Sequence, residues 1–120
     1  MRDFKNLEVW KEAHQIAKEC YKVSSYFPQE EKFGLTSQLR RSSLSIPTNL
    51  AEGCGRGSQK DLKRFCDIAM GSASEVEYLL FFINEIGILQ YQDYKSLSES
   101  LITMKKRLNA LIQKLKSNVQ

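Results

Sequence analysis

The sequence predicts an all-α protein, and within that class a single-domain, antiparallel up-and-down four-helix bundle. Four long segments repeat apolar residues every three or four positions, as the buried face of a helix does. The connections between these segments are short, which favours antiparallel neighbours, and no segment alternates apolar and polar residues as a strand would. A domain of 120 residues has a small interior, so self-association is expected to add stability.

The first helix is predicted over residues 7–26. Trp10 and Ala13 belong to one apolar stripe at helical spacing, and a second apolar stripe runs beside it. Asn6 stands in the position of an N-cap, and Pro28 follows the helix and opens a short connection.

The second helix is predicted over residues 35–54, with Pro47 inside it. A proline within a helix removes one backbone donor and clashes with the carbonyl four residues earlier, which costs about 3 kcal/mol when uncompensated. The apolar spacing nevertheless continues through Pro47 without a change of phase, which predicts one kinked helix and not two. The hydroxyls of Ser42, Ser43 and Ser45 are expected to supply local hydrogen bonds around the freed carbonyl.

The glycine-rich stretch EGCGRGS raises the question of a phosphate-binding loop. No Gly-Lys-Ser or Gly-Lys-Thr follows it and no strand precedes it, so neither a P-loop nor a dinucleotide-binding loop is predicted. Turn chemistry is the better explanation. Gly53 is expected to adopt the left-handed conformation that ends a helix. Ser58 is expected to cap the third helix, predicted over residues 59–86, with Asp61 in the capping-box position.

Residues 78–83 of the third helix, YLLFFI, are apolar in succession and therefore cover every side of the helix. A helix that is apolar all round must be covered all round. The first interpretation is a subunit interface that includes Tyr78, Phe81 and Phe82. The alternative is burial of this side under the connection at residues 27–34.

The fourth helix is predicted over residues 93–116. Its apolar residues are separated alternately by four and three positions, which suits the seam of a bundle. These residues are Leu97, Leu101, Met104, Leu108, Leu111 and Leu115.

The formal net charge of +4 is distributed unevenly along the chain. Residues 38–66 contain six basic and two acidic side chains, and residues 101–120 contain five basic and no acidic ones. Residues 67–100 contain six acidic side chains and one basic one. Such a polarised surface could meet an anionic partner such as RNA or DNA, or it could be a solvated helix face with a basic tail.

The sequence contains no pattern typical of a catalytic or metal site. Lys11 stands where the Glu-x-x-His motif of a di-iron bundle would place its glutamate before His14, the single histidine. No arginine precedes His14 at the spacing that some helical RNases use. The three cysteines are an odd number without C-x-x-C spacing, which predicts reduced thiols. We expect no enzyme activity, no metal and no cofactor.

The first ten residues, MRDFKNLEVW, lack the apolar run of a signal peptide. No stretch approaches the roughly 18 apolar residues that a membrane-spanning helix needs. Together with the cysteine usage, this predicts a cytoplasmic protein without membrane association.

A polar stripe runs beside the apolar face of the predicted second helix. It could face solvent, form a hydrogen-bonded seam between subunits, or face a ligand. Its residues are Gln38, Arg41, Ser45, Asn49, Glu52 and Arg56.

Several runs of the sequence resemble a bacterial four-helix-bundle family named for open reading frames in intervening sequences of 23S rRNA genes, also called the S23 ribosomal protein family. The most specific are GLTSQLRR followed by SIPTNLAEGCGRGS, and GSASEVEYLL. The resemblance covers about residues 4–115. Gly57 departs from the pattern, because the family often has a further basic residue there.

The resemblance implies an antiparallel four-helix bundle that assembles as a ring-like homopentamer, with no catalytic residues to carry over. A related branch comprises the accessory variability proteins of diversity-generating retroelements. These form basic pentamers that bind nucleic acid and a reverse transcriptase. The resemblance therefore implies a second copy of the chain, RNA or DNA, and a reverse transcriptase or other protein as partners.

We therefore predict a non-enzymatic, homo-oligomeric scaffold that binds RNA or DNA through basic surfaces. The alternative is a purely protein-binding oligomer whose basic residues form ion pairs between subunits or keep the ring soluble. Base stacking is not expected, because the aromatic residues fall mostly on predicted core stripes. The candidate nucleic-acid-binding residues are Arg40, Arg41, Arg56, Lys60, Lys63, Arg64, Lys105, Lys106 and Arg107. The candidate interface residues are Gln38, Asn49, Glu52, Tyr78, Phe81 and Phe82.

Overall fold

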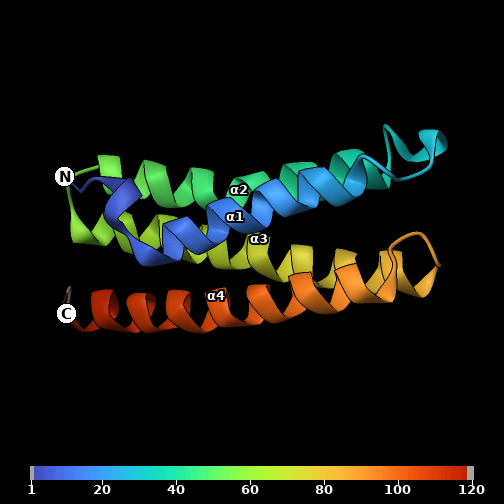
Figure 1. Cartoon of the computed structure of the whole chain (residues 1–120). Helices are drawn as coiled ribbons and strands as arrows, with labels where there is room; N and C mark the ends of the chain where they lie inside the picture. The colour runs from blue at the N-terminus through green and yellow to red at the C-terminus, as the bar shows by residue number, and fades with distance from the viewer. Residues whose placement is uncertain (1, 119–120) are drawn as a thin grey trace.

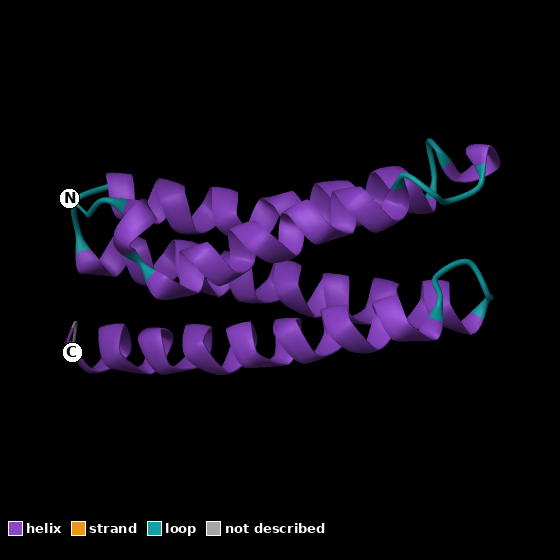
Figure 2. Cartoon of the chain, viewed as in Figure 1, coloured by secondary structure: helices purple, strands orange, loops and turns teal. Residues whose placement is uncertain are grey.

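A computed structural model describes residues 2–118, and almost all of them are helical (Figure 2). These residues include no strand, so the predicted all-α class is confirmed. No predicted helix end differs from the observed one by more than two residues. The elements are η1 (Phe4–Asn6), α1 (Glu8–Ser24), η2 (Gln29–Glu31), α2 (Leu35–Gly55), α3 (Gln59–Glu85) and α4 (Tyr91–Asn118), where η denotes a short 3-10 helix.

The four α-helices form an up-and-down bundle in which each helix is antiparallel to the next (Figure 1). Helix α1 packs against α2 and α4, and α3 packs against the same two helices. The bundle measures 46 × 22 × 20 Å. The N-terminal η1, the C-terminal end of α4 and the α2–α3 turn lie at one end of the bundle, at the left of Figure 1, and the other two connections lie at the opposite end.

The apolar stripes of all four helices meet in one continuous core. In α4 the predicted seam is buried except at one position, where Ile112 is buried and Leu111 is only half-buried. A straight helix has 3.6 residues per turn, so a repeat of 3.5 residues drifts by about 20° per heptad away from the seam. That drift explains why the buried position moves by one residue near the end of α4.

Helix α2 continues through Pro47 without interruption, and the proline is buried. The neighbouring hydroxyls do not act as predicted. Ser42 Oγ donates to Glu75 Oε2 at 2.7 Å, and Ser45 Oγ shares a hydrogen bond with Ser72 Oγ at 2.9 Å. These two serines therefore join α2 to α3 through their hydroxyls. Within α2, Ser43 Oγ donates to the carbonyl of Arg40, and Ser45 Oγ also accepts a hydrogen bond from Asn49 Nδ2.

The glycines of the α2–α3 turn act differently from the prediction. Helix α2 ends at Gly55, and Gly57, with a φ of 86°, adopts the left-handed conformation expected of Gly53. Gly53 is instead buried against α3. A Cβ atom there would lie 2.9 Å from Phe65 Cβ and 3.1 Å from Leu62 Cδ1. Gly53 thus allows the two helices to approach closely.

The predicted cap of α3 is confirmed, because Ser58 Oγ accepts a hydrogen bond from the backbone N–H of Asp61 at 3.1 Å. The predicted cap of α1 is wrong. Asn6 belongs to η1, and Leu7 occupies the N-cap position without a side-chain hydrogen bond.

Candidate nucleic-acid interface and assembly surface

The nine candidate nucleic-acid-binding residues lie in three groups. Arg40 and Arg41 lie in the first half of α2, and Lys105, Lys106 and Arg107 lie near the middle of α4. The remaining four lie around the α2–α3 turn, at the same end of the bundle as the C-terminal end of α4 (Figure 1). Arg41 and Arg56, the nearest members of the α2 group and the turn group, are 15 residues apart in the chain, or about 23 Å of helix at 1.5 Å per residue.

Arg40 is a structural residue that ties α2 to the end of α1. Its Nε donates to Ser24 Oγ at 2.7 Å, and its Nη2 donates to the carbonyl of Tyr21 at 3.1 Å. The guanidinium also lies over the Tyr21 ring, 4.9 Å from its centroid. A cation at a helix C-terminus is favourable because the last carbonyls carry partial negative charge. Arg41, by contrast, is exposed and forms no ion pair within residues 2–118.

Two arginines at the α2–α3 turn enclose Phe65. The guanidinium of Arg56 lies 5.0 Å from the ring centroid and that of Arg64 lies 4.6 Å from it, and the ring itself is buried. Arg56 Nη2 also pairs with Glu52 Oε2 at 2.7 Å, and Arg64 Nη2 lies 3.8 Å from Asp61 Oδ1. The two guanidinium groups are thereby held close to one end of the bundle.

The two lysines of this turn differ in their surroundings. Lys63 Nζ pairs with Asp67 Oδ2 at 2.8 Å, one helical turn further along α3. Lys60 is exposed and has no ion pair among the described residues.

The basic residues of α4 point toward different neighbours. Lys105 Nζ reaches Glu77 Oε1 of α3 at 2.6 Å, and Arg107 Nε reaches Glu12 Oε1 of α1 at 2.7 Å. Lys106, between them, is exposed and has no ion pair in the described part of the chain. Lys105 and Arg107 therefore bridge to helices on two sides of α4, and the three basic residues do not form one patch.

These ion pairs are partly exposed to solvent, and such pairs contribute only about 0–1 kcal/mol. A phosphate could therefore exchange with the carboxylate of Glu52 or Asp61 at low cost. Among the four candidates without an ion pair in the described part of the chain, Arg40 is hydrogen-bonded to α1, and the exposed Arg41, Lys60 and Lys106 would need no exchange at all.

An aromatic ridge on α3 is the main exposed apolar feature of the expected assembly surface. We use this name for Tyr78, Phe81, Phe82 and Ile86, which follow one another at helical spacing. The first three side chains are 61%, 49% and 37% exposed. The rings of Tyr78 and Phe82 lie 6.1 Å apart. Burial of this ridge under the connection at residues 27–34, the alternative drawn from the sequence, is therefore wrong for the single chain.

The other three candidate interface residues lie on α2. Asn49 is half-buried and its Nδ2 donates to the carbonyl and to Oγ of Ser45, so this part of the polar stripe is satisfied within the subunit. Glu52 is engaged by Arg56, and Gln38 is exposed. The stripe is thus partly an internal contact between α2 and α3 and partly a solvent-facing surface.

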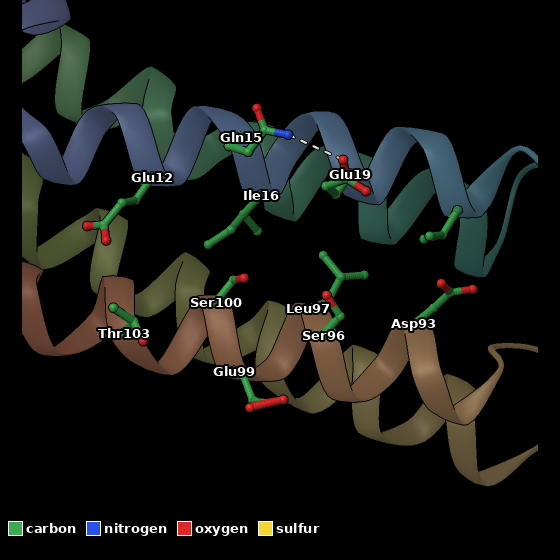
Figure 3. A pocket seen from close by; sticks show the side chains of 11 residues that line it. Glu12, Gln15, Ile16, Glu19, Asp93, Ser96, Leu97, Glu99, Ser100 and Thr103 are labelled. Atoms are coloured by element: carbon green, nitrogen blue, oxygen red, sulfur yellow. Dashed lines mark hydrogen bonds between the residues drawn. The ribbon is translucent and has the colours of Figure 1, made fainter.

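The surface between α1 and α4 is unsuited to a polyanion. A groove of about 420 Å³ has an apolar floor that includes Ile16 and Leu97. Its walls carry acidic side chains and no basic one (Figure 3). The acidic residues are Glu12, Glu19, Asp93 and Glu99. Nucleic acid would be repelled from this groove.

The expectation that aromatic residues lie mostly in the core is wrong: Phe65 is the only buried one among the described residues, and Tyr21, Tyr26, Phe33 and Tyr91 are exposed outside the ridge. Phe33 is 90% exposed and Tyr26 is 85% exposed. Both lie between α1 and α2 and outside every helical stripe. That position in the sequence was the signal that they need not be buried.

The three cysteine thiols are buried, and burial raises the pKa of each. Burial raises the pKa of the Cys20 and Cys66 thiols to about 12, which keeps both in the unreactive protonated form at neutral pH. His14 stacks on Trp10 with ring centroids 4.7 Å apart. Residues 2–118 contain no group of three or more side chains placed to hold a metal ion. No helix among them has both the length and the apolar character to cross a membrane.

The crystal structure of a protein with unknown function from Bacteroides thetaiotaomicron VPI-5482, from the S23 ribosomal protein family, is similar to this chain. The TM-score is 0.81 at 24% sequence identity, with 88% of this chain and 95% of that chain covered. At this identity the likeness shows the fold alone. A search of curated proteins found no match.

A family model described as 23S rRNA-intervening sequence protein matches residues 5–110. Neither this description nor that of the similar structure names a catalytic activity. Because the match spans most of the 120 residues, and because the four-helix bundle agrees with the similar structure, the chain belongs to the 23S rRNA-intervening sequence protein family.

Proposed function

We propose that this protein is a non-enzymatic, homo-oligomeric scaffold of the cytoplasm that binds RNA or DNA through its basic surfaces, with five subunits as the expected assembly. The observation that carries the proposal is the aromatic ridge of α3. Three aromatic side chains in a row on one helix face leave a contiguous apolar surface in water, which a monomer rarely does. Cover by a second copy of the chain removes that surface from solvent.

Nucleic-acid binding is supported by the distribution of cations. The α2–α3 turn carries Arg56, Lys60, Lys63 and Arg64 at one end of the bundle, and symmetric assembly would repeat this group in every subunit. Five copies of a chain with net charge +4 would carry about +20, enough for salt-dependent attachment to phosphates.

A second candidate function is a purely protein-binding oligomer. It is favoured by the fact that five of the nine candidate basic residues already pair with carboxylates of the same chain. A reverse transcriptase is one protein partner that the family resemblance suggests for such a scaffold.

Two measurements on the full chain test the proposal. Light scattering at micromolar concentration should report a mass several times that of the 13.8 kDa chain, and a monomer mass would refute the assembly. Fluorescence anisotropy with labelled mixed-sequence RNA and DNA should show binding that weakens steeply between about 50 and 200 mM salt. An oligomer that binds neither nucleic acid at about 50 mM salt would leave the protein-binding function in its place.

A further inference from the structure

A shallow groove of about 670 Å³ lies along the outer face of α2, next to the α1–α2 connection. Three of its lining residues, Lys32, Arg40 and Arg41, are basic, and none of the lining residues is acidic. The rest of the lining consists of aromatic, hydroxyl, amide and aliphatic side chains. The groove therefore has the opposite charge from the groove between α1 and α4.

Two aromatic side chains lie at one end of the groove. Phe33 is almost fully exposed, and Lys32 Nζ lies 5.5 Å from its ring centroid. Tyr21 is partly exposed, and its ring is fixed by the guanidinium of Arg40, which in turn is anchored on the end of α1. An exposed, unpacked phenylalanine beside lysine and arginine is an unusual arrangement for a surface that faces only water.

The unpaired arginine is the cation best placed to bind an anion in this groove. Arg41 is exposed and has no carboxylate partner in the described part of the chain, whereas Arg40 has committed two of its donor groups to α1. Arginine is well suited to phosphate because its planar fork can donate two hydrogen bonds at once.

We propose that this α2 groove binds a single-stranded segment of RNA or DNA. Arg41 and Lys32 would contact its phosphates, and Phe33, with Tyr21 behind it, would stack on its unpaired bases. This inference rests on the nucleic-acid binding proposed above and assigns it to a surface.

A single strand fits the groove better than a duplex does. The aromatic rings can stack only on bases that are not already stacked between base pairs, and a groove that combines cations with stacking residues is typical of single-strand binding. The α2 part of the lining, from Thr36 to Asn49, spans 14 residues, or about 20 Å from the first to the last at a rise of 1.5 Å per residue. A short single strand of nucleic acid can lie along a groove of this length.

The test compares four variants of the full chain. Arg41→Ala and Phe33→Ala alter the groove. Lys95→Ala removes an exposed lysine of α4 outside the groove, and Tyr26→Ala removes a similarly exposed aromatic side chain outside it. The probes are a fluorescein-labelled single strand of about 12 nucleotides, as RNA and as DNA, and the duplex of the same sequence. All four side chains are exposed, so circular dichroism should show an unchanged helical fold.

The two groove variants are expected to affect different properties of binding: Phe33→Ala the affinity for a single strand, and Arg41→Ala the salt dependence. Phe33→Ala should weaken single-strand binding about 5-fold or more, without changing its salt dependence, and should leave duplex binding nearly unchanged. Arg41→Ala should lower the slope of log affinity against log salt by about 0.7, the value of one phosphate contact on a single strand. The two control variants should bind as the wild type does.

The outcomes separate this inference from the function on which it rests. Wild-type protein that binds no nucleic acid at low salt would end both. If the wild type binds nucleic acid and Arg41→Ala and Phe33→Ala bind it with the same affinity, the groove is not the binding site. Nucleic acid would then bind elsewhere, for example at the α2–α3 turn. Tighter binding to the duplex than to the single strand would also overturn the assignment to the groove. So would a loss of oligomer mass in both groove variants with unchanged nucleic-acid affinity, because the groove would then be a contact between subunits.

Discussion

Arg40 of α2 donates a hydrogen bond from Nε to Ser24 Oγ of α1 at 2.7 Å, across 16 residues of chain. The same guanidinium caps the carbonyl of Tyr21, so a side chain named as a nucleic-acid contact by its charge holds two helices together. The next residue, Arg41, is exposed and makes neither contact, so the two neighbouring arginines can be compared directly.

Replacement of Arg40 by alanine is expected to lower the free energy of unfolding by about 1–2 kcal/mol. Two hydrogen bonds from a charged donor are lost. The one to Ser24 is partly buried and the one to the Tyr21 carbonyl is exposed, so water replaces part of the interaction. Urea denaturation at fixed protein concentration measures the change. Arg41→Ala removes the same charge without these contacts and should stay within about 0.5 kcal/mol of the wild type. Equal effects of the two substitutions would show that the contact between the helices contributes nothing.

A second matched pair lies at the end of α2. Gly53→Ala places a methyl group 2.9 Å from Phe65 Cβ, so α2 and α3 must separate or the core must shift, at a cost of about 1–3 kcal/mol. The gain in helix propensity of up to about 1 kcal/mol offsets only part of this cost. We expect lower stability in thermal and urea denaturation.

Gly55→Ala is the control, because no heavy atom lies within 4 Å of a Cβ at that position and its φ is not positive. The same gain in propensity then acts alone, and the variant should be as stable as the wild type or slightly more so. A Gly53→Ala protein as stable as Gly55→Ala would contradict the close approach of the two helices.

These glycines show where prediction from the sequence succeeds and where it stops. The helices were predictable because apolar residues recur with the helical period, which fixes the buried face of each segment. The packing role of Gly53 was not predictable, because it arises from the close approach of Leu62 and Phe65 of α3 to the backbone of α2. The nearest sequence rule, a left-handed helix end, applies instead to Gly57.

In the candidate site too, contacts within one helix were predictable from the sequence and contacts between helices were not. The pairs Glu52–Arg56 and Lys63–Asp67 are four residues apart on one helix, so their spacing already indicates contact. The pair of Lys105 with Glu77 spans 28 residues and depends on how α3 and α4 pack. Charge counted along the chain therefore overstates the number of free cations, because pairing across helices is set by the fold.

Because the Cys20 thiol is buried, we expect the protein to lose stability at alkaline pH. Burial raises its pKa from an ordinary value of 9.0 to about 12, and the side chain is fully buried. Between these two values the folded chain keeps a proton that the unfolded chain releases, so the free energy of unfolding falls as pH rises from about 9. One such thiol contributes a fall of about 1.4 kcal/mol per pH unit. The measurement is urea denaturation from about pH 8 to about pH 10.5.

Other groups also titrate in this range, so the test compares slopes. Cys20→Ala is expected to be less stable at neutral pH, because it leaves a small cavity, but to lose stability less steeply above pH 9. Parallel curves for the variant and the wild type would mean that the thiol ionises equally easily in both states.

The aromatic ridge of α3 predicts that assembly depends on side chains that do little for the fold of one subunit. The double substitution of Phe81 and Phe82 by serine removes two large apolar surfaces that are already partly exposed in the single chain. Burial of one phenylalanine at an interface contributes about 1.5–3 kcal/mol, so dissociation should become at least tenfold easier. Light scattering over a dilution series should show the mass falling toward 13.8 kDa while circular dichroism stays unchanged. Tyr26→Ser, at an exposed aromatic residue outside the ridge, should keep the wild-type mass, and an undiminished mass in the double variant would place the contact between subunits on another face.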